Sequence, residues 1–439
     1  MGSIGPVVRT TGTSGDAWLR SHATSPRVDQ RRGCHGTTSA AGDGPTRDSV
    51  EGAQPSGESM PKRTDLLVIG AGPYAYSAAA HARFNGIETH IVGRSMAFWQ
   101  DQMPDEMFLR SGPDWHLDAD GNYTFEAFFE DRKMRPEDFD PIPIAVFIGY
   151  AEWFRQRTSL EVDERLATDL TKPNGAFVAT LDDGSTISAE KVVAVPGVSY
   201  FAHFPQWHTK VPPELRSHTS ELVSFDSLAG ARVVIIGGRQ SAYEWAALLA
   251  DHGAEQVHVV HRHPTPQFAK VSWAFVNPYI EQTLAQRGWW RRLPAEERQR
   301  ISGEFWRVGR LTLEPWLVPR LATGAVTSHP NSAVVDLTPE DQAVRLRLSD
   351  QTTLTADHVI FACGYKADLS RIPYLRSVSD QVSTTDGFPD LTEGFETSLP
   401  GLHVIGFAST RDFGPFYGFT KGCPSSARIA VDELMRRTA

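Results

Sequence analysis

Two stretches of the chain share one order of apolar and polar positions, and this order predicts a strand, a tight glycine turn and a helix. In the first stretch, the apolar run 66–69 precedes GAGPYAYSAAAHARFNG, and the apolar IETHIVG follows. In the second, VVIIGGRQ begins at residue 233, an alanine- and leucine-rich segment follows, and VHVVHR comes next. Short apolar runs on either side of a helical segment are typical of βαβ units. The sequence therefore predicts two such units, whose turns begin at Gly70 and Gly237.

Two later apolar runs indicate that the chain returns to a sheet after the second unit. HVIFACGYKAD (358–368) and GLHVIGFASTRDFGPF (401–416) each predict a buried strand and a polar turn, and residues 423–437 predict a helix. We therefore predict an α/β fold with two Rossmann-like dinucleotide-binding domains, in which the second is inserted into a discontinuous first domain. The predicted bounds are 60–210 and 340–439 for the first domain, and 211–339 for the second domain with its helical insertion.

The segment before residue 60 has a different composition. Residues 1–59 are rich in Gly, Ser, Thr and Arg and show almost no aliphatic periodicity, so they lack the apolar surface that folding requires. They contain neither the apolar core of a signal peptide nor the acid-poor composition of a transit peptide. We expect a disordered tail, with Met60 as a candidate start of the functional chain.

Composition and charge narrow the function. The chain has 439 residues, a length typical of two domains, and a net charge of −10. This charge argues against nucleic acid, because phosphate contacts require clustered Lys and Arg. No apolar run reaches the ~18 residues that span a bilayer. The cysteines, Cys34, Cys363 and Cys423, form neither a C-x-x-C pair nor a zinc ligand set. We expect a cytoplasmic enzyme with no membrane or nucleic-acid partner, and the sequence leaves open whether it forms a homo-oligomer.

Two further clusters have alternative explanations. Residues 287–321 interleave aromatic and basic side chains, as single-strand nucleic-acid sites do, but the overall charge favours packing against the rest of the fold. His258, His261 and His263 lie close together in sequence. No carboxylate or cysteine accompanies them, so we predict no metal site.

The first turn fits a dinucleotide fingerprint. Gly70, Gly72 and Ala75 fill the positions of G-x-G-x-x-G/A. The first glycine permits the tight turn, the second lets the backbone approach a pyrophosphate, and the small third residue lets helix and strand pack closely. The N–H groups at the start of the helix then face the phosphates. The Asp or Glu that usually meets the ribose is absent, because Gly93 and Arg94 stand there.

The second turn departs from the fingerprint, because its second glycine position holds Arg239. We predict that Arg239 is a ligand-side residue that modifies nucleotide binding; the alternative is that it obstructs the turn. Arg262 ends the second strand of this unit, and a guanidinium there suits the 2′-phosphate of NADP. The alternative for Arg262 is a solvated loop charge.

The motifs GAGPYAYSAAAH, FWQDQMPDEMFLRS, GGRQSAYEWAALL, FACGYKAD and STRDFGPFYGFTKGCP together resemble the class B flavin-dependent monooxygenases, near their amino-acid N-hydroxylase branch. The resemblance covers residues 62–435 and implies FAD at the first turn and NADPH at the second. It also implies that the helix after Gly422 points toward the flavin ring. The implied cofactor-binding residues are Gly70, Gly72, Pro73, Ala75, Phe98, Trp99, Met103, Gly237, Gly238, Arg239, Gln240, Ser241, Arg262, Gly364, Gly406 and Asp412.

The resemblance implies an NADPH-consuming enzyme that inserts one atom of molecular oxygen into a small-molecule nucleophile, at nitrogen or sulfur, through a C4a-peroxyflavin. Pro212 and Glu214 replace the Phe and Gly of the F-x-G-x-x-x-H motif before His218, which disfavours Baeyer–Villiger chemistry. Gln100 after Trp99 replaces the histidine usual in amino-acid N-hydroxylases. His218 is a candidate site residue or a hydrogen-bonded loop histidine. The alternatives are an NAD(P)H-dependent flavin oxidoreductase without oxygen insertion and a catalytically silent redox-sensing flavoprotein.

Overall fold

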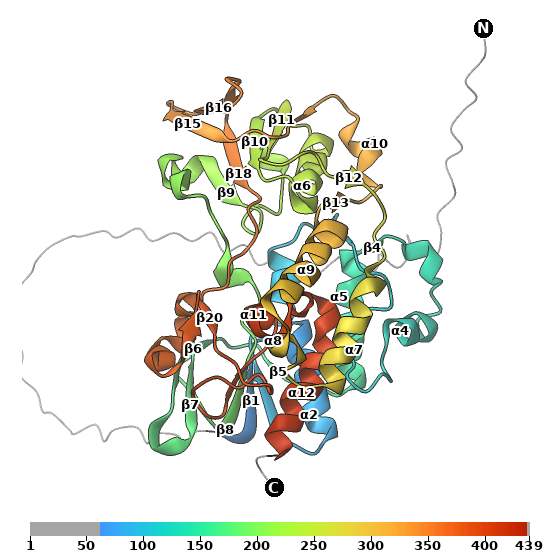
Figure 1. Cartoon of the computed structure of the whole chain (residues 1–439), viewed down its shortest axis with the longest axis vertical. Coiled ribbons are helices and arrows are strands. Elements are labelled where there is room, and N and C mark those ends of the chain that lie inside the picture. The colour runs from blue at the N-terminus through green and yellow to red at the C-terminus, as the bar shows by residue number, and fades with distance from the viewer. Residues whose placement is uncertain (1–61, 437–439) are drawn as a thin grey trace, which may run out of the picture.

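The computed structural model describes residues 62–436 (Figure 1). The expected tail 1–59 and the candidate start at Met60 lie outside these residues. Both predicted βαβ units are present. The first consists of β1 (Lys62–Ile69), α2 (Pro73–Phe84) and β2 (Thr89–Val92); the second consists of β10 (Arg232–Ile236), α6 (Gln240–Asp251) and β11 (Gln256–Val260).

The first sheet has the strand order β5-β2-β1-β8-β7-β6, and β21 pairs with β8. Its further strands are β5 (Val162–Asp163), β6 (Ala167–Thr171), β7 (Phe177–Leu181), β8 (Thr186–Ala194) and β21 (Leu402–Val404). Strands β5, β2, β1, β8 and β21 are parallel, whereas β6 and β7 form an antiparallel extension. The strand predicted within 401–416 is therefore confirmed, because β21 returns to the first sheet late in the chain.

The second sheet is wholly parallel, in the order β14-β11-β10-β18-β9, and lies above the first in Figure 1. It adds β9 (Arg216–His218), β14 (Val326–His329) and β18 (His358–Phe361). Successive residues of a strand such as β10 point to opposite faces of the sheet. Val233 and Ile235 join α6 in one buried cluster, and Val234 joins a three-stranded antiparallel sheet in another. That small sheet consists of β15 (Val334–Pro339), β16 (Val344–Leu348) and β17 (Thr353–Ala356).

The strand pairing moves one predicted boundary. The second domain was predicted to end at 339, but β16, β17 and β18 all follow that residue and pack on or pair with the second sheet. The apolar run of β18 looks like any buried strand, so the sequence did not show which sheet it joins. We propose that the chain returns to the first domain after Phe361, and that the fold is the predicted nested pair. The predicted α/β class is confirmed.

Most of the remaining helices pack with the first sheet, whereas the helix at 317–321 packs against α6 in the second unit. They are α3 (Ala97–Asp101), α4 (Phe125–Asp131), α5 (Ile144–Arg157), α7 (Asn277–Ala285), α8 (Trp289–Arg292), α9 (Ala295–Glu304), α10 (Leu317–Leu321), α11 (Thr410–Phe413) and α12 (Cys423–Arg436). Three two-residue strand pairs join loops: β3 (Phe108–Leu109) with β4 (Ile142–Pro143), β12 (Gln267–Phe268) with β13 (Thr312–Leu313), and β19 (Thr384–Thr385) with β20 (Phe388–Pro389). Within 62–436, no helix has the length and apolar character needed to cross a membrane.

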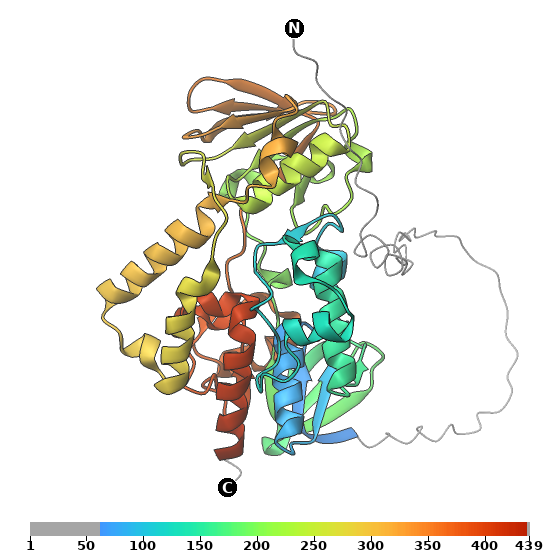
Figure 2. The same cartoon turned by 90° about the vertical axis from the view of Figure 1, so that its right-hand side faces the viewer.

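The aromatic and basic segment packs against the rest of the fold, as predicted. Helix α7, which precedes this segment, lies beside the C-terminal helix α12 (Figure 2), and α8 packs against α11. Arg287 pairs with Asp432 at 3.0 Å and with Glu433 at 3.1 Å, and the Trp290 indole N–H donates to the Arg411 carbonyl at 3.1 Å. The segment is inserted in the second unit by sequence, but its apolar side chains up to Phe305 join the core of the first, whereas Leu313 and Leu317 join the core of the second.

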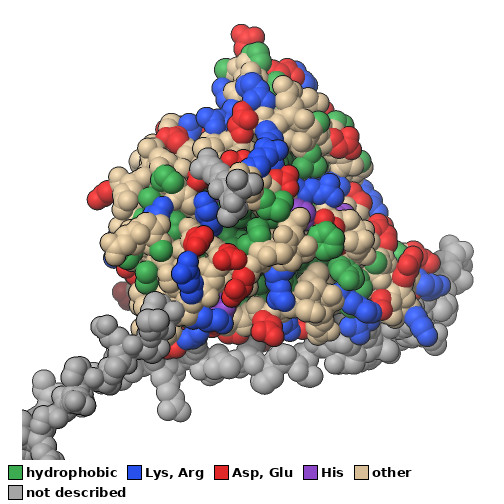
Figure 3. Space-filling view, turned by 90° about the horizontal axis from the view of Figure 1, so that it is seen from below, with side chains coloured by type: hydrophobic (Ala, Val, Ile, Leu, Met, Phe, Trp, Pro, Cys, Tyr) green, Lys and Arg blue, Asp and Glu red, His purple; other side chains and the backbone are tan. Residues whose placement is uncertain are grey.

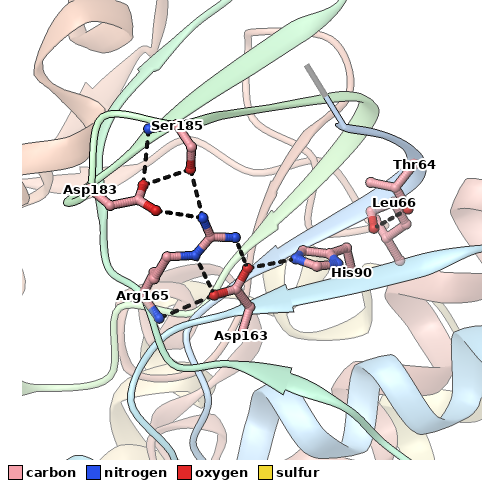
Figure 4. A network of polar contacts seen from close by, with 7 residues as sticks. All are labelled: Thr64, Leu66, His90, Asp163, Arg165, Asp183 and Ser185. Carbon is pink, nitrogen blue, oxygen red and sulfur yellow. Dashed lines mark hydrogen bonds and ion pairs between the residues drawn. The ribbon is translucent and has the colours of Figure 1, made fainter. Parts of the chain in front are cut away.

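A polar network fixes the edge of the first sheet beside the first turn (Figure 4). Asp163, at the end of β5, accepts hydrogen bonds from Arg165 Nε at 2.7 Å and contacts His90 Nε2 at 3.1 Å. Arg165 also donates to Asp183 and Ser185, each at 2.7 Å. The Arg165 guanidinium holds the pKa of the Asp163 carboxyl well below its usual range.

The network extends to the turn through the backbone. The Asp163 carbonyl accepts from Gly93 N–H at 2.9 Å, where β2 ends. The side-chain network therefore holds in place the strand end at which a dinucleotide ribose is expected.

We predict that Asp163→Asn lowers the free energy of unfolding by about 1–3 kcal/mol at neutral pH, because it leaves the Arg165 charge with one fewer partner. The pKa of Asp163 is lower in the folded state than in the unfolded state, so the stabilisation is complete above about pH 4 and is lost as the pH falls below that value. Urea denaturation of both proteins from pH 8 to pH 3 measures the difference. Asp341→Asn, at an exposed turn, is the control; an equal loss there, or a difference that grows on acidification, contradicts the prediction.

Candidate functional site

Both glycine turns are held by the same backbone contacts. Gly70 has φ +122°, donates its N–H to Val92 O at 2.8 Å, and would place a Cβ 2.5 Å from Val195 O. Gly237 has φ +144°, donates to the carbonyl at the end of β11 at 3.0 Å, and would place a Cβ 2.4 Å from Ala362 O. A side chain is excluded at both positions, because the neighbouring strand end lies too close.

The second position of each turn is the residue that immediately precedes the helix. Gly72 precedes α2 with φ −96°, and Arg239 precedes α6 with φ −111°. Both angles are open to any L-residue, and a Cβ added at Gly72 would meet no atom within 4 Å. Arg239 therefore replaces the second glycine without straining the turn, and its guanidinium lies over the Trp306 ring, 4.3 Å from the centroid.

The middle residue of each turn explains the missing acid at position 93. A Cβ on Gly93 would approach Ala71 N at 3.2 Å. In the second turn, a Cβ on Gly238 would lie 2.2 Å from Cγ of His261, the residue that follows β11. The first turn thus leaves little room for a side chain at position 93, because the backbone of Gly70 and Ala71 lies there; in the second turn the His261 side chain takes the space beside Gly238. Gly93 is required by packing, so the ribose contact comes from another residue or is missing.

A single large cavity connects the two turns. Its volume is 2120 Å³, about twice the upper end of the ~300–1,000 Å³ usual for a small-molecule site. Of the predicted cofactor-binding residues, all but Ala75 line it: Gly70, Gly72, Pro73, Phe98, Trp99, Met103, Gly237, Gly238, Arg239, Gln240, Ser241, Arg262, Gly364, Gly406 and Asp412. Ala75 is fully buried in α2, in agreement with a packing role for the third fingerprint position.

The lining residues between the turns are largely aromatic. Trp99, on α3, packs on Phe147 with ring centroids 4.6 Å apart and meets Phe98 edge to face at 6.1 Å. Phe98 meets Tyr365 at 6.3 Å, beside Gly364. Such walls keep water away from a bound ring system.

Two of the predicted ligands use their side chains to support the protein. The Gln240 amide donates to Glu244 at 2.6 Å and its oxygen accepts from Glu314 N–H at 2.9 Å. Asp412 Oδ2 accepts from Leu391 N–H at 2.9 Å. Each side chain therefore positions neighbouring backbone at the cavity wall. Both residues line the cavity, but the sequence did not show these partners, and their contact with a cofactor stays a prediction.

Arg262 points into the cavity beside the second turn. It is exposed, and within 62–436 no ion pair to it is found. The positions of Arg239 and Arg262 put two positive charges at the mouth of this turn.

The histidines of the second unit have structural partners. His218 is fully buried on β9, with Nε2 at 3.1 Å from Gly364 O and Nδ1 at 2.9 Å from Ser220 Oγ. His261 contacts the Tyr243 hydroxyl at 3.0 Å, and His258 contacts His329 at 3.1 Å. Burial lowers the pKa of each of these four histidines. His218 does not line the cavity, so the hydrogen-bonded histidine is the alternative that the structure supports.

Sequence reasoning missed Tyr74, which locks the C-terminal segment onto the first turn. Its hydroxyl donates to Phe419 O at 2.7 Å and to Tyr417 O. A Cβ on Gly422 would lie 2.5 Å from this hydroxyl. Tyr74 lines the cavity, whereas α12 contributes no lining residue. The predicted orientation of the α12 N-terminus toward a flavin ring stays a prediction.

The cavity wall is basic although the chain is acidic. Among the lining residues, eight are Lys or Arg and three are Asp or Glu. On the outer face shown in Figure 3, acidic and basic side chains are interspersed instead. The net charge of the chain is −10, but the basic cavity wall favours the binding of anionic ligands.

Two glycine turns facing one basic cavity define a nucleotide-dependent oxidoreductase with two dinucleotide-binding units. The model of the pyridine nucleotide-disulphide oxidoreductase family matches residues 64–296. The chain belongs to this family of enzymes. Cys363 and Cys423 are free thiols, and burial raises the pKa of both.

Among curated relatives, the chain is 24% identical over 354 residues to a FAD-dependent urate hydroxylase of Xanthomonas campestris pv. campestris, which covers 72% of this chain and 71% of the relative. It is 29% identical over 203 residues to a ferredoxin–NADP reductase of Nocardioides sp., covering 45% of this chain and 54% of that protein. Its fold matches ornithine hydroxylase from Pseudomonas aeruginosa with a TM-score of 0.70 at 17% identity, over 86% of this chain and 100% of the other. The predicted resemblance to class B flavin-dependent monooxygenases is confirmed at the level of fold.

We predict that Gly238→Ala lowers the free energy of unfolding by about 1–3 kcal/mol, because its Cβ would overlap the base of the His261 side chain. In a His261→Gly background, which copies the Ala71–Gly93 arrangement of the first turn, the same substitution should cost less than half as much. Urea denaturation of the four proteins in this double-mutant cycle gives the coupling energy. Strictly additive losses would show that the two positions do not share one space.

Proposed function

We propose that the protein is a FAD-dependent, NADPH-consuming monooxygenase that inserts one oxygen atom into a small-molecule nucleophile. The observation that carries this proposal is the single cavity shared by both glycine turns and covered by the aromatic helical segment. A cavity of this kind can hold two dinucleotides and a substrate together. The likeness to a FAD-dependent urate hydroxylase over most of the chain supports the oxygen-inserting reaction.

The first turn fits FAD. Gly72 leaves open space where a pyrophosphate would approach the N–H groups at the start of α2. Phe98, Trp99 and Met103 line the cavity beyond the turn, where they would flank the flavin ring. Gly406 and Gly364 line the opposite part of the wall, both at positive φ, so backbone and not side chain borders the cofactor there.

The second turn fits NADPH. Gly237, Gly238 and Ser241 surround the start of α6, which would face the pyrophosphate. Arg262 would pair with the 2′-phosphate, because its guanidinium is exposed in the cavity at the end of β11. Arg239 lies between the pyrophosphate position and the helical segment, and we propose that it contacts NADPH without blocking the turn.

FAD supplies the hydride acceptance and oxygen activation when it is bound. The chain's own residues bind, orient and shield. Aromatic side chains from three segments, Trp99, Trp290 and Phe419, line the cavity and exclude water from the reacting atoms. Tyr74 holds the Phe419 segment at a fixed distance from the first turn.

A second candidate function is electron transfer from NADPH through FAD to another acceptor, without oxygen insertion. The likeness to ferredoxin–NADP reductases favours it, and with two of these relatives it extends over 79% of this chain at 23% identity. The helical segment 277–310 argues against it, because this segment covers the cavity from which an external redox protein would draw electrons.

The test is to purify the protein, measure its FAD content, and follow NADPH oxidation and oxygen uptake with urate, amines, thioethers and ketones. We expect a yellow protein that prefers NADPH to NADH. We also expect one substrate class to raise NADPH oxidation at least tenfold and to yield a product carrying one atom from isotope-labelled oxygen. NADPH oxidation that proceeds only with an external electron acceptor, and gives no labelled product, would assign the protein to the second candidate function.

A further inference from the structure

We propose that Arg310 and Trp306 form a substrate subsite for a planar organic anion, and that Arg239 strengthens it. This inference rests on the proposed function and names the class of substrate that the cavity would select. It concerns the part of the cavity wall that the helical segment 277–310 forms. None of the predicted cofactor-binding residues lies in this segment.

The subsite is built on a π-helical turn. Residues Phe305–Arg310 form this turn, and Leu311 N–H donates to Trp306 O at 2.8 Å across it. A π-turn costs stability relative to an α-helix and is found at functional positions. Here it brings Trp306 and Arg310 to the same cavity wall.

Aromatic rings hold the guanidinium groups by their faces. Arg310 lies over Phe419 at 5.1 Å and over Trp306 at 5.6 Å, and Arg239 lies over Trp306 at 4.3 Å from the ring centroid. A stacked guanidinium keeps its N–H donors free at its edge. The N–H groups at that edge can donate hydrogen bonds to two oxygens of an anion in a bidentate geometry.

These charges have no protein counterion. Among the described residues, no carboxylate pairs with Arg239 or Arg310; the nearby Glu314 pairs with Arg110 at 2.9 Å. Burial, with the charges of Arg110 and Arg239, lowers the pKa of Arg310 to about 10, so it stays protonated at neutral pH. An unpaired cation in a partly buried place destabilises a protein. Its retention here is explained by a ligand that brings the missing negative charge.

Arg310 comes from a different part of the chain than the cofactor turns, although it shares the Trp306 ring with Arg239. Arg239 and Arg262 belong to the second turn and its neighbouring strand, whereas Arg310 comes from the helical segment and packs on Phe419 of the C-terminal segment. Trp115, Trp273 and Trp306 line the same cavity, and Trp115 meets Trp273 edge to face at 5.5 Å. Flat apolar walls around an unpaired guanidinium suit a flat ring that carries a negative charge.

Equilibrium dialysis of the purified protein with saturating NADP⁺ tests the subsite without turnover. The probes are two planar anions, urate and benzoate, each with a neutral counterpart of similar shape, hypoxanthine and benzamide. We expect the wild type to bind at least one anion tenfold more tightly than its counterpart, and Arg310→Gln to abolish that preference. Arg262→Gln should weaken NADP⁺ about tenfold and change the anion Kd less than twofold. Arg345→Gln, on an exposed strand position, is the surface control.

Two results would overturn the proposal: a wild type without preference for either anion, or an Arg310→Gln protein in which only the NADP⁺ affinity falls. The thermal unfolding midpoint without ligand is a second readout. It should stay equal or rise in Arg310→Gln, because an unpaired cation is removed; a fall of several degrees would assign Arg310 a structural role instead. Anion binding through Arg310 in a protein that forms no oxygenated product would contradict the proposed function alone.

Discussion

Two strand ends approach two glycine turns so closely that no side chain fits between them, and the rest of the site depends on this contact. Val195 O and Ala362 O take the space of a Cβ at Gly70 and Gly237, and each strand is tied back to its neighbour by a backbone hydrogen bond of 2.8 or 2.9 Å. The contact fixes where α2 and α6 begin. Both helix N-termini thereby face one cavity, where anionic groups are favoured.

The second constraint is charge. The chain is acidic overall, yet its cavity is lined mainly by basic side chains, of which Arg94, Arg110 and Arg411 are neutralised by neighbouring carboxylates. Among the described lining residues that have no ion pair, Arg239 and Arg262 belong to the second turn and its neighbouring strand, and Arg310 belongs to the π-helical turn. In the proposed function dinucleotide phosphates would pair with Arg239 and Arg262, and in the proposed subsite a charged substrate would pair with Arg310. Binding of an anion would offset the cost of partly burying the Arg310 charge.

The sequence predicted the parts that local patterns determine. Both βαβ units, the late strand at 402–404 and the C-terminal helix follow from apolar periodicity, and the glycines of the turns follow from backbone sterics. It did not place β18, because the sequence of a short apolar strand does not indicate which sheet the strand joins. It did not explain Gly93, because the reason lies in a contact with Ala71. Arg310 and Trp306 are four residues apart in a segment that looks like an ordinary amphipathic helix, and their meeting with Arg239 and Phe419 depends on tertiary packing.

The central claim is that the open space in front of Gly72 exists for a cofactor and not for folding. The most direct measurement is the FAD affinity of Gly72→Ala beside its thermal unfolding midpoint without cofactor. The added methyl group would meet no protein atom within 4 Å, so the account predicts an unchanged midpoint together with a loss of FAD affinity of at least tenfold. A Gly72→Ala protein that is equally stable and binds FAD as tightly as the wild type would contradict it.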